Sequence, residues 1–496
     1  MSKDIFTLGL NSLIECLNAS PEIIKYDTIS RCKFLSLAFV DDVNVITRQV
    51  RSVFRILELI DLFGEISGFR LNLGKTEGFF VNQENFVTTG SLPPIKWVEN
   101  MLVLGVNFGK KEWENSQWES KFIDFKREIA FFKSKSPTFD ARAMLSKFKL
   151  CSVFSYIGNV FPVPERLREK IDDQMVKFMV PHGKTFLTAM DFSLPRRFGG
   201  YNTSNVLLHL DLCYIKPIMQ YVSEKLGDVV ISSNMSFVEY NIGLSLCRLF
   251  NLNVNNSTVH RSEPNVYYKQ MMNVISKYHI TLDELIEGKV SRIYYRIVCE
   301  YGERTAGGVL YSRLHKKIFP NYLKTFNYKT HFDLLPVKGK FHELALDSQE
   351  KITCPFCNIN LESAVHIFAN CNKLKKIWDF LDETTKACFN GQCTYSFVSS
   401  RRGWEYTVVD CRCNQRYENL FLYLNGIVNY NIWKLRNQIF HENVIFDADN
   451  LINKIISTIC ARKNMEDNLK TCNQIEHIVQ YAVALGSIRD AMYDPG

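Results

Sequence analysis

Two short runs of β-forming residues lie on either side of a pair of aspartates near the start of the chain. Residues 34–46 read Phe-Leu-Ser-Leu-Ala-Phe-Val-Asp-Asp-Val-Asn-Val-Ile. This pattern predicts a β-hairpin with Asp41 and Asp42 at its tip. Adjacent carboxylates on a rigid hairpin can hold a divalent cation such as Mg²⁺. Because Asp is also a favoured turn residue, the same pattern fits an ordinary polar turn.

Apolar residues at helical spacing follow the hairpin. They predict a helix that begins with Thr47 as its N-cap, runs to about Ile66 and stops at Ser67-Gly68. The segment 4–17 predicts an earlier core helix, since polar residues break any signal-like apolar run there. Helical periodicity continues through most of the chain. We therefore predict a mainly α fold with a small α+β element.

Three helices rich in basic residues are predicted after residue 110. An apolar stripe from Trp118 to Phe132 predicts the first, which Pro137 ends, and residues 140–154 and 166–179 predict the others. Residues 110–200 hold 17 Lys and Arg against 11 Asp and Glu, which is most of the net charge of +8. This surplus suggests a face that meets a phosphate backbone. A solvated helix surface would explain it equally well.

The composition limits the class of protein. The chain has 496 residues, 46% of them hydrophobic, which is enough for several domains with buried cores. Its 15 cysteines are scattered and follow no secretory signal, so a reducing compartment is expected rather than secretion. No apolar run reaches the roughly 18 residues that a membrane span needs, so no membrane association is expected.

Three cysteines and one histidine predict a metal site. Cys354, Cys357, His366 and Cys371 form a C-x2-C-x8-H-x4-C arrangement. Two cysteines two residues apart fit a tight knuckle that directs both sulfurs at one ion, and a short helix over 361–368 can deliver the histidine. Four such ligands with no open position describe a structural, tetrahedral Zn²⁺ site. Unrelated buried cysteines at these spacings are the alternative.

Three sequence blocks occur in a fixed order in the amino-terminal part. They are Phe39-Val40-Asp41-Asp42, Ser-Gly-Phe-Arg-Leu-Asn-Leu-Gly-Lys-Thr at 67–76, and Leu104-Gly105-Val106. Together they resemble the reverse-transcriptase palm of non-LTR (LINE-type) retrotransposons. The Cys-His motif resembles the one that follows the thumb in this family, and residues 431–440 resemble a further family element.

The resemblance implies a domain organisation. The expected parts are an incomplete reverse-transcriptase palm (β-hairpin plus helices) at 1–110, a basic helical thumb at 111–203, a helical connection at 204–348, a small zinc-knuckle module at 349–380 and a helical carboxy-terminal region at 381–496.

The resemblance also implies residue roles. Asp41 and Asp42 would be the catalytic Mg²⁺ ligands of an RNA-directed DNA polymerase. Lys75 would lie near the incoming deoxynucleoside triphosphate or the closing loop, and Leu104-Gly105-Val106 would resemble the primer grip. Three basic residues of the thumb helices would contact nucleic acid, namely Lys126, Arg127 and Arg142. The implied partners are template-primer RNA and DNA, and the implied location is the nucleus and cytoplasm, as a ribonucleoprotein.

The family's first catalytic aspartate and its fingers would precede the first residue of this chain. A two-metal polymerase site needs carboxylates from two strands, and only one such strand is recognised here. We therefore expect the chain to bind nucleic acid but to be polymerase-deficient alone. The alternatives are a domesticated or remnant zinc-containing RNA-binding or scaffold protein without catalysis, and an incomplete gene model.

Overall fold

The computed structural model describes most of the chain. The described residues are 3–24, 26–27, 33–34, 36–39, 42–80, 92–109, 113–180, 185, 187–224, 237–250, 266–305, 319–339, 352–389, 393–399, 405–411 and 415–466. Within them the fold is mainly helical, as predicted, and the strands form two-stranded sheets. None of the described helices combines the length and the apolar character that crossing a membrane requires.

The chain divides into two compact units, and each unit combines segments that are distant in sequence. The first unit contains residues 1–134, 148–171 and 206–297, and the second contains residues 135–147, 172–205 and 298–496. Three helical elements contribute to both units: the π-helical segment Ser146–Leu150, α6 (Glu165–Met179) and α13 (Val290–Thr305). The five predicted domain limits remain predictions.

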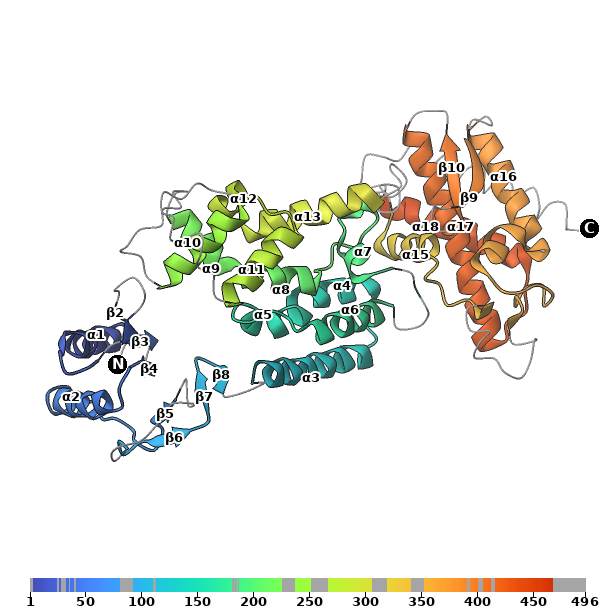
Figure 1. Ribbon diagram of the computed structural model, residues 1–496. Helices are drawn as coiled ribbons and strands as arrows, with labels where there is room; N and C mark the ends of the chain where they lie inside the picture. Colours follow the sequence, from blue (N-terminus) through green and yellow to red (C-terminus); the bar gives the residue numbers. More distant parts are fainter. Residues whose placement is uncertain are drawn as a thin grey trace, which may run out of the picture. The chain divides into compact units, whose positions relative to one another are not determined.

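The first unit holds the amino-terminal strand pairs, which lie near α1 and α2 in Figure 1, and a series of helices. Its elements are α1 (Lys3–Ala19), β1 (Tyr26–Asp27), β2 (Lys33–Phe34), β3 (Ser36–Phe39), β4 (Asp42–Val45), α2 (Arg51–Ser67), β5 (Glu77–Phe79), β6 (Lys96–Val98), β7 (Asn100–Val103), β8 (Val106–Gly109), α3 (Trp113–Ser134), α5 (Ser152–Gly158), α8 (Val206–Tyr214), α9 (Lys216–Glu224), α10 (Phe237–Leu249), α11 (Val266–Lys277) and α12 (Leu282–Glu287).

The predicted hairpin is present. β3 and β4 pair antiparallel with Phe39 opposite Asp42, and the predicted tip at residues 40 and 41 lies outside the described residues. The helix that follows, α2, packs beside α1 (Figure 1), and Leu13, Leu17 and Ile56 share a small core there. Alternating apolar strand residues and helical apolar stripes therefore produce the α+β element that the sequence predicts.

Helix α2 confirms its predicted end but not its predicted start. Gly68 has a φ of 75° and its N–H donates to Gly64 O at 2.9 Å, so the chain leaves the helix through a left-handed glycine. The predicted N-cap at Thr47 is wrong. The Thr47 hydroxyl donates to Gln49 O at 3.0 Å, and the helix begins only at Arg51.

The helix predicted over 140–154 is interrupted. α4 (Phe139–Leu145) ends where the π-helical segment 146–150 begins, and α5 follows it. At the junction the buried Ser146 hydroxyl donates to Ala143 O at 2.7 Å. A serine side chain that bonds a carbonyl in the preceding turn competes with the regular helical ladder.

The second unit contains a large core built by three long helices and the segment before them. Its elements are α4, α7 (Ala189–Ser193), the 3₁₀ turn Arg196–Phe198, α15 (Asn321–His331), the π-helical turn His366–Asn370, the 3₁₀ turn Asn372–Leu374, α16 (Lys375–Phe389), β9 (Cys393–Ser399), β10 (Glu405–Cys411), α17 (Gln415–Glu442) and α18 (Ala448–Glu466).

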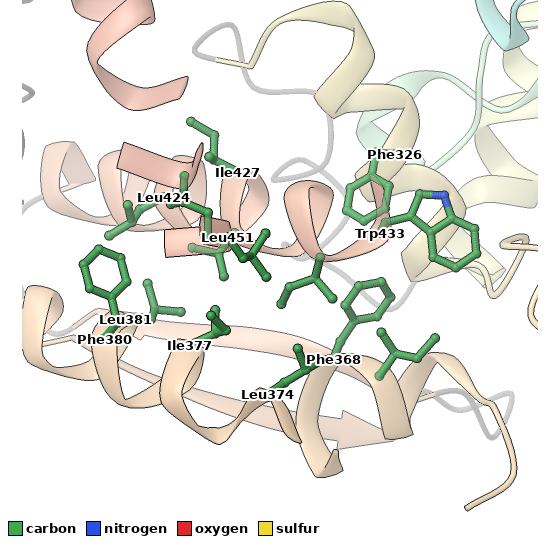
Figure 2. Close-up of a cluster of buried hydrophobic side chains, with 14 of the residues drawn as sticks. Phe326, Phe368, Leu374, Ile377, Phe380, Leu381, Leu424, Ile427, Trp433 and Leu451 are labelled. Atoms are coloured by element: carbon green, nitrogen blue, oxygen red, sulfur yellow. The ribbon is translucent and has the colours of Figure 1, made fainter. Parts of the chain in front are cut away.

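Figure 2 shows how this core is filled. Ile377 and Leu381 of α16 point toward Leu424 and Ile427 of α17 and toward Leu451 of α18. Each of these side chains is at most 2% exposed. Burying a side chain of this size stabilises the fold by about 1.5–3 kcal/mol, so the three helices are held together mainly by this apolar contact. The antiparallel pair β9–β10 runs alongside α16 and α17 (Figure 1).

Candidate metal centre and nucleic-acid surface

The four predicted metal ligands lie together. The Sγ atoms of Cys354, Cys357 and Cys371 and a ring nitrogen of His366 are all within 4.8 Å of one another. Cys354 Sγ is 4.0 Å from Cys371 Sγ, and Cys357 Sγ is 3.4 Å from His366 Nε2. The cluster could hold a metal ion such as zinc.

These distances fit a tetrahedral zinc ion. Zinc–sulfur bonds of about 2.3 Å and zinc–nitrogen bonds of about 2.0 Å place the ligand atoms of a tetrahedron roughly 3.5–3.8 Å apart. The two contacts of 3.4 and 4.0 Å lie on either side of this range, and a separation at the 4.8 Å limit would have to close by about 1 Å. A disulfide would need a sulfur separation of about 2.05 Å, and the three cysteines are unpaired thiols. With four protein ligands the site would stabilise structure and would leave no position open for catalysis.

A tight backbone turn directs the first two cysteines. Cys354 N–H donates to Asn360 O and Asn358 N–H donates to Cys354 O, both at 2.8 Å. Asn358 has a φ of 54°, a conformation that Asn tolerates better than most residues. Thr353 and Leu361 form an isolated antiparallel bridge at the base of the turn. These backbone bonds set the positions of Cys354 and Cys357 at the two ends of the knuckle.

The histidine and the last cysteine come from the helical turn that follows. His366 N–H donates to Ser363 Oγ at 3.0 Å, and residues 366–370 form a π-helical turn that ends at Cys371. Burial lowers the pKa of His366, which favours the neutral imidazole that a metal needs. The hydrogen bond between Cys354 and Cys371 raises the pKa of the first thiol and lowers that of the second.

An ion pair that is buried on both sides supports the knuckle. Glu362 is 0% exposed and Arg436 of α17 is 2% exposed, and Arg436 Nε and Nη2 donate to the two carboxylate oxygens at 2.6 and 2.8 Å. Lys338 N–H donates to Glu362 Oε2 at 2.6 Å. The guanidinium also lies 5.0 Å from the ring centroids of Trp433 and Phe440. Bidentate, charge-assisted bonds of this kind fix geometry strongly.

The sequence interpretation missed Glu362 and Arg436. Both lie inside stretches that it used, the zinc motif and the segment 431–440, but neither stretch indicates that the two charges meet. One signal could have found the pair. A charged residue among apolar neighbours is expected to be buried, and a buried charge requires a partner of opposite charge.

The structure describes the catalytic candidates only in part. Asp41 lies outside the described residues, and Asp42 is described only by its backbone, as the first residue of β4. Lys75 is exposed, in a turn where its N–H donates to Asn72 O at 3.0 Å.

Leu104 and Gly105 form the two-residue turn between β7 and β8. Their φ values are 48° and 78°, the left-handed pair that a type I′ hairpin turn requires. The Tyr156 hydroxyl of α5 donates to Leu104 O, and a Cβ added at Gly105 would lie 3.5 Å from the Tyr156 ring. The side chains of Leu104 and Tyr156 are 40% and 54% exposed. The turn therefore presents an exposed apolar residue that α5 holds in place.

The three basic candidates differ in their surroundings. Lys126 and Arg127 are exposed on α3, with the Lys126 ammonium 5.1 Å from the Phe122 ring and Arg127 paired to Asp124 at 3.1 Å. α3 also carries the predicted apolar stripe, in which Trp118 and Phe125 are fully buried. Both basic residues are therefore available to a polyanion.

Arg142 is different, because its Nε donates to Pro137 O at 3.0 Å and its Nη1 donates to Phe178 O at 3.1 Å. Burial lowers its pKa.

No protein-family model matches the chain, and no curated protein is significantly similar to it. The resemblance to LINE-type reverse transcriptases therefore rests on the sequence blocks alone.

Proposed function

We propose that this chain is the nucleic-acid-binding, zinc-containing carboxy-terminal part of a LINE-type RNA-directed DNA polymerase. The observation that carries the proposal is the convergence of Cys354, Cys357, His366 and Cys371, whose ligand atoms all lie within 4.8 Å of one another. The motif that resembles the family's Cys-His element therefore brings together four ligand atoms that could hold a metal ion, and a structural zinc ion is the one that such a ligand set favours.

Two further features support the proposal. The β3–β4 hairpin brings Asp42 to the start of a strand, where it and Asp41 would bind Mg²⁺ if carboxylates of a second strand complete the site. The exposed cations Lys126 and Arg127 would contact the phosphates of template-primer RNA and DNA, with deoxynucleoside triphosphates as substrates of a completed palm. The protein would act in the nucleus and cytoplasm as a ribonucleoprotein.

Binding of a fluorescein-labelled RNA over a range of salt concentrations tests the nucleic-acid function. Affinity should fall steeply as salt rises, because phosphate contacts release counterions. Lys126→Glu with Arg127→Glu should weaken binding about tenfold or more. Lys289→Glu with Arg292→Glu is the charge-matched control on two other exposed residues, Arg292 being paired to Glu287 as Arg127 is to Asp124. Equal losses in the two variants, or binding that ignores salt, would refute a specific role for α3.

Primer extension on an RNA template tests the polymerase chemistry. We expect RNA binding without extension by this chain alone, because a two-metal site needs carboxylates from a second strand. Extension by the wild type that is lost in Asp41→Ala with Asp42→Ala would contradict this expectation and would assign polymerase chemistry to the chain.

A further inference from the structure

One side of the segment that runs from the π-helical turn 146–150 into α5 is exposed and carries two aromatic rings. Phe148 is 66% exposed, and Tyr156, about 12 Å further along the helix, is 54% exposed. Ser152 lies midway and is also exposed, as expected for residues four apart on one side of a helix. Leu150 and Phe154 are fully buried. The two rings are therefore exposed on a helix that its other side anchors in the core.

The Tyr156 ring is held in place without being covered. Its hydroxyl donates to Leu104 O in the turn between β7 and β8, and a Cβ added at Gly105 would lie 3.5 Å from the ring. Because these contacts already restrict the ring, a ligand that stacks on it costs little further conformational entropy.

The residues around Phe148 are positively charged. Lys147 and Lys149 are exposed on either side of it, and in the part of the chain that the structure describes neither ammonium pairs with a carboxylate. Residues 141–164 contain three basic residues and no acidic residue. Residues 100–109, which form β7, β8 and their turn, contain no charged residue. Neither segment therefore neutralises the two lysines.

The helices that pack against α5 supply no compensating negative charge either. These helices are α3 and α8 (Figure 1). α3 carries four acidic and four basic residues. The one acidic residue of α8 is Asp211, which is buried and bonded by Arg168 at 2.9 Å. The positive charge beside Phe148 is therefore available to an external anion.

We propose that Phe148 and Tyr156 stack on the bases of a single-stranded stretch of nucleic acid whose phosphates contact Lys147 and Lys149. Every base has a π-face that an exposed ring can cover, whereas bases inside a duplex are already stacked on one another. A protein partner fits this surface less well, because lysine is depleted at protein–protein interfaces. The inference rests on the nucleic-acid binding of the proposed function, but not on its polymerase assignment.

Fluorescence anisotropy of a labelled single-stranded RNA of about 12 nucleotides tests the stacking. Phe148→Ala should weaken binding at least about fivefold. It should leave the slope of log affinity against log salt unchanged, because stacking releases no counterions. Phe148→Trp should keep the wild-type affinity, since tryptophan also stacks on bases. Phe148 is exposed, so both variants should fold.

Tyr156→Ala should weaken binding in the same way, and Tyr295→Ala is its matched control. Tyr295 of α13 is 53% exposed, but the nearby Arg292 and Arg296 are each paired to a glutamate. Tyr295→Ala should therefore bind single-stranded RNA as the wild type does.

The lysines and a duplex probe separate charge from stacking. Lys147→Gln with Lys149→Gln should reduce the salt slope by about 0.7 for each phosphate contact that is lost. A duplex RNA of the same sequence should bind to Phe148→Ala and to the wild type equally, because its bases offer no free face.

Four results would overturn the stacking site. The first is single-stranded RNA affinity that Phe148→Ala leaves unchanged; if Lys126→Glu with Arg127→Glu weakens the same binding, the proposed function stands without this site. The second is an equal loss for single-stranded and duplex RNA, and the third is full rescue by Phe148→Leu, which is apolar but cannot stack. The fourth is a wild type that binds no RNA and forms a dimer that Phe148→Ala abolishes, which would assign the rings to a second copy of the chain.

The opposite outcome separates this site from α3. Single-stranded RNA binding that Phe148→Ala weakens and that Lys126→Glu with Arg127→Glu leaves unchanged would confirm the stacking site and refute the role of α3.

Discussion

Arg436 on α17 and Glu362 beside the metal ligands form a bidentate ion pair in which both side chains are almost completely buried. The two residues are 74 positions apart in the chain. The pair therefore joins the Cys-His segment to a helix of the core through two charge-assisted hydrogen bonds.

Removing one partner of this pair should be severe. Arg436→Met leaves Glu362 buried without its counter-charge, which typically costs about 3–5 kcal/mol of unfolding free energy. Urea unfolding measures the loss. Lys434→Met is the control, because Lys434 is exposed two residues away on the same helix. The double variant Glu362→Gln with Arg436→Met should recover part of the loss, and a double variant no better than Arg436→Met would contradict this explanation.

Zinc should be bound at about one equivalent per chain and should stabilise the second unit. Cys354→Ser with Cys357→Ser removes two thiolate ligands, so it should abolish metal binding and lower the thermal unfolding temperature. Elemental analysis and thermal unfolding measure the two effects. Cys16→Ser changes an exposed cysteine of the first unit and should alter neither. Metal-free wild type, or a double variant that keeps its metal, would disprove the assignment.

The turn at residue 104 should show a conflict between stability and binding. Leucine is strained at a φ of 48°, and Asn-Gly is the preferred pair for this turn. Leu104→Asn should therefore raise the unfolding free energy by about 0.5–1 kcal/mol. If the exposed leucine contacts a primer, the same change should weaken RNA–DNA binding. Stabilisation without any loss of binding would leave the primer-grip role unsupported.

Asp211 should make stability depend on acid pH. Burial raises the pKa of this carboxyl, but Arg168, Tyr278 and Lys277 bond it and hold its pKa below the usual value. The native state therefore binds this proton less readily than the unfolded state does. The stabilisation is present above the ordinary Asp pKa of about 3.9 and is lost as pH falls below it.

Urea unfolding between about pH 3 and 6 tests this dependence. Asp211→Asn should be less stable than wild type at neutral pH and should flatten the acid limb of the profile. Asp173→Asn is the control, because Asp173 forms an exposed pair with Lys177. If the stability of the wild type varied with pH as little as that of Asp211→Asn, Asp211 would not make stability depend on acid pH.

Local features were predictable from the sequence and distant ones were not. The four metal ligands span only 17 positions, so the knuckle turn and one helical turn set their distances. The hairpin at Asp42 and the stop at Gly68 are local for the same reason. Arg168 and Asp211 are 43 positions apart, and Asp140 and Thr325 are 185 positions apart. Their meeting depends on how helices pack, which periodicity does not specify.

The Glu362–Arg436 pair also bears on how this protein can change through recombination. A recombination breakpoint between residues 371 and 436 would replace only one partner of this pair. The buried charge that remains would then face a side chain that does not match it. Such a hybrid would lose much of a typical domain's total stability of about 5–15 kcal/mol. The Cys-His segment and α17 are therefore expected to be inherited together, and fragments for expression should keep both on one polypeptide.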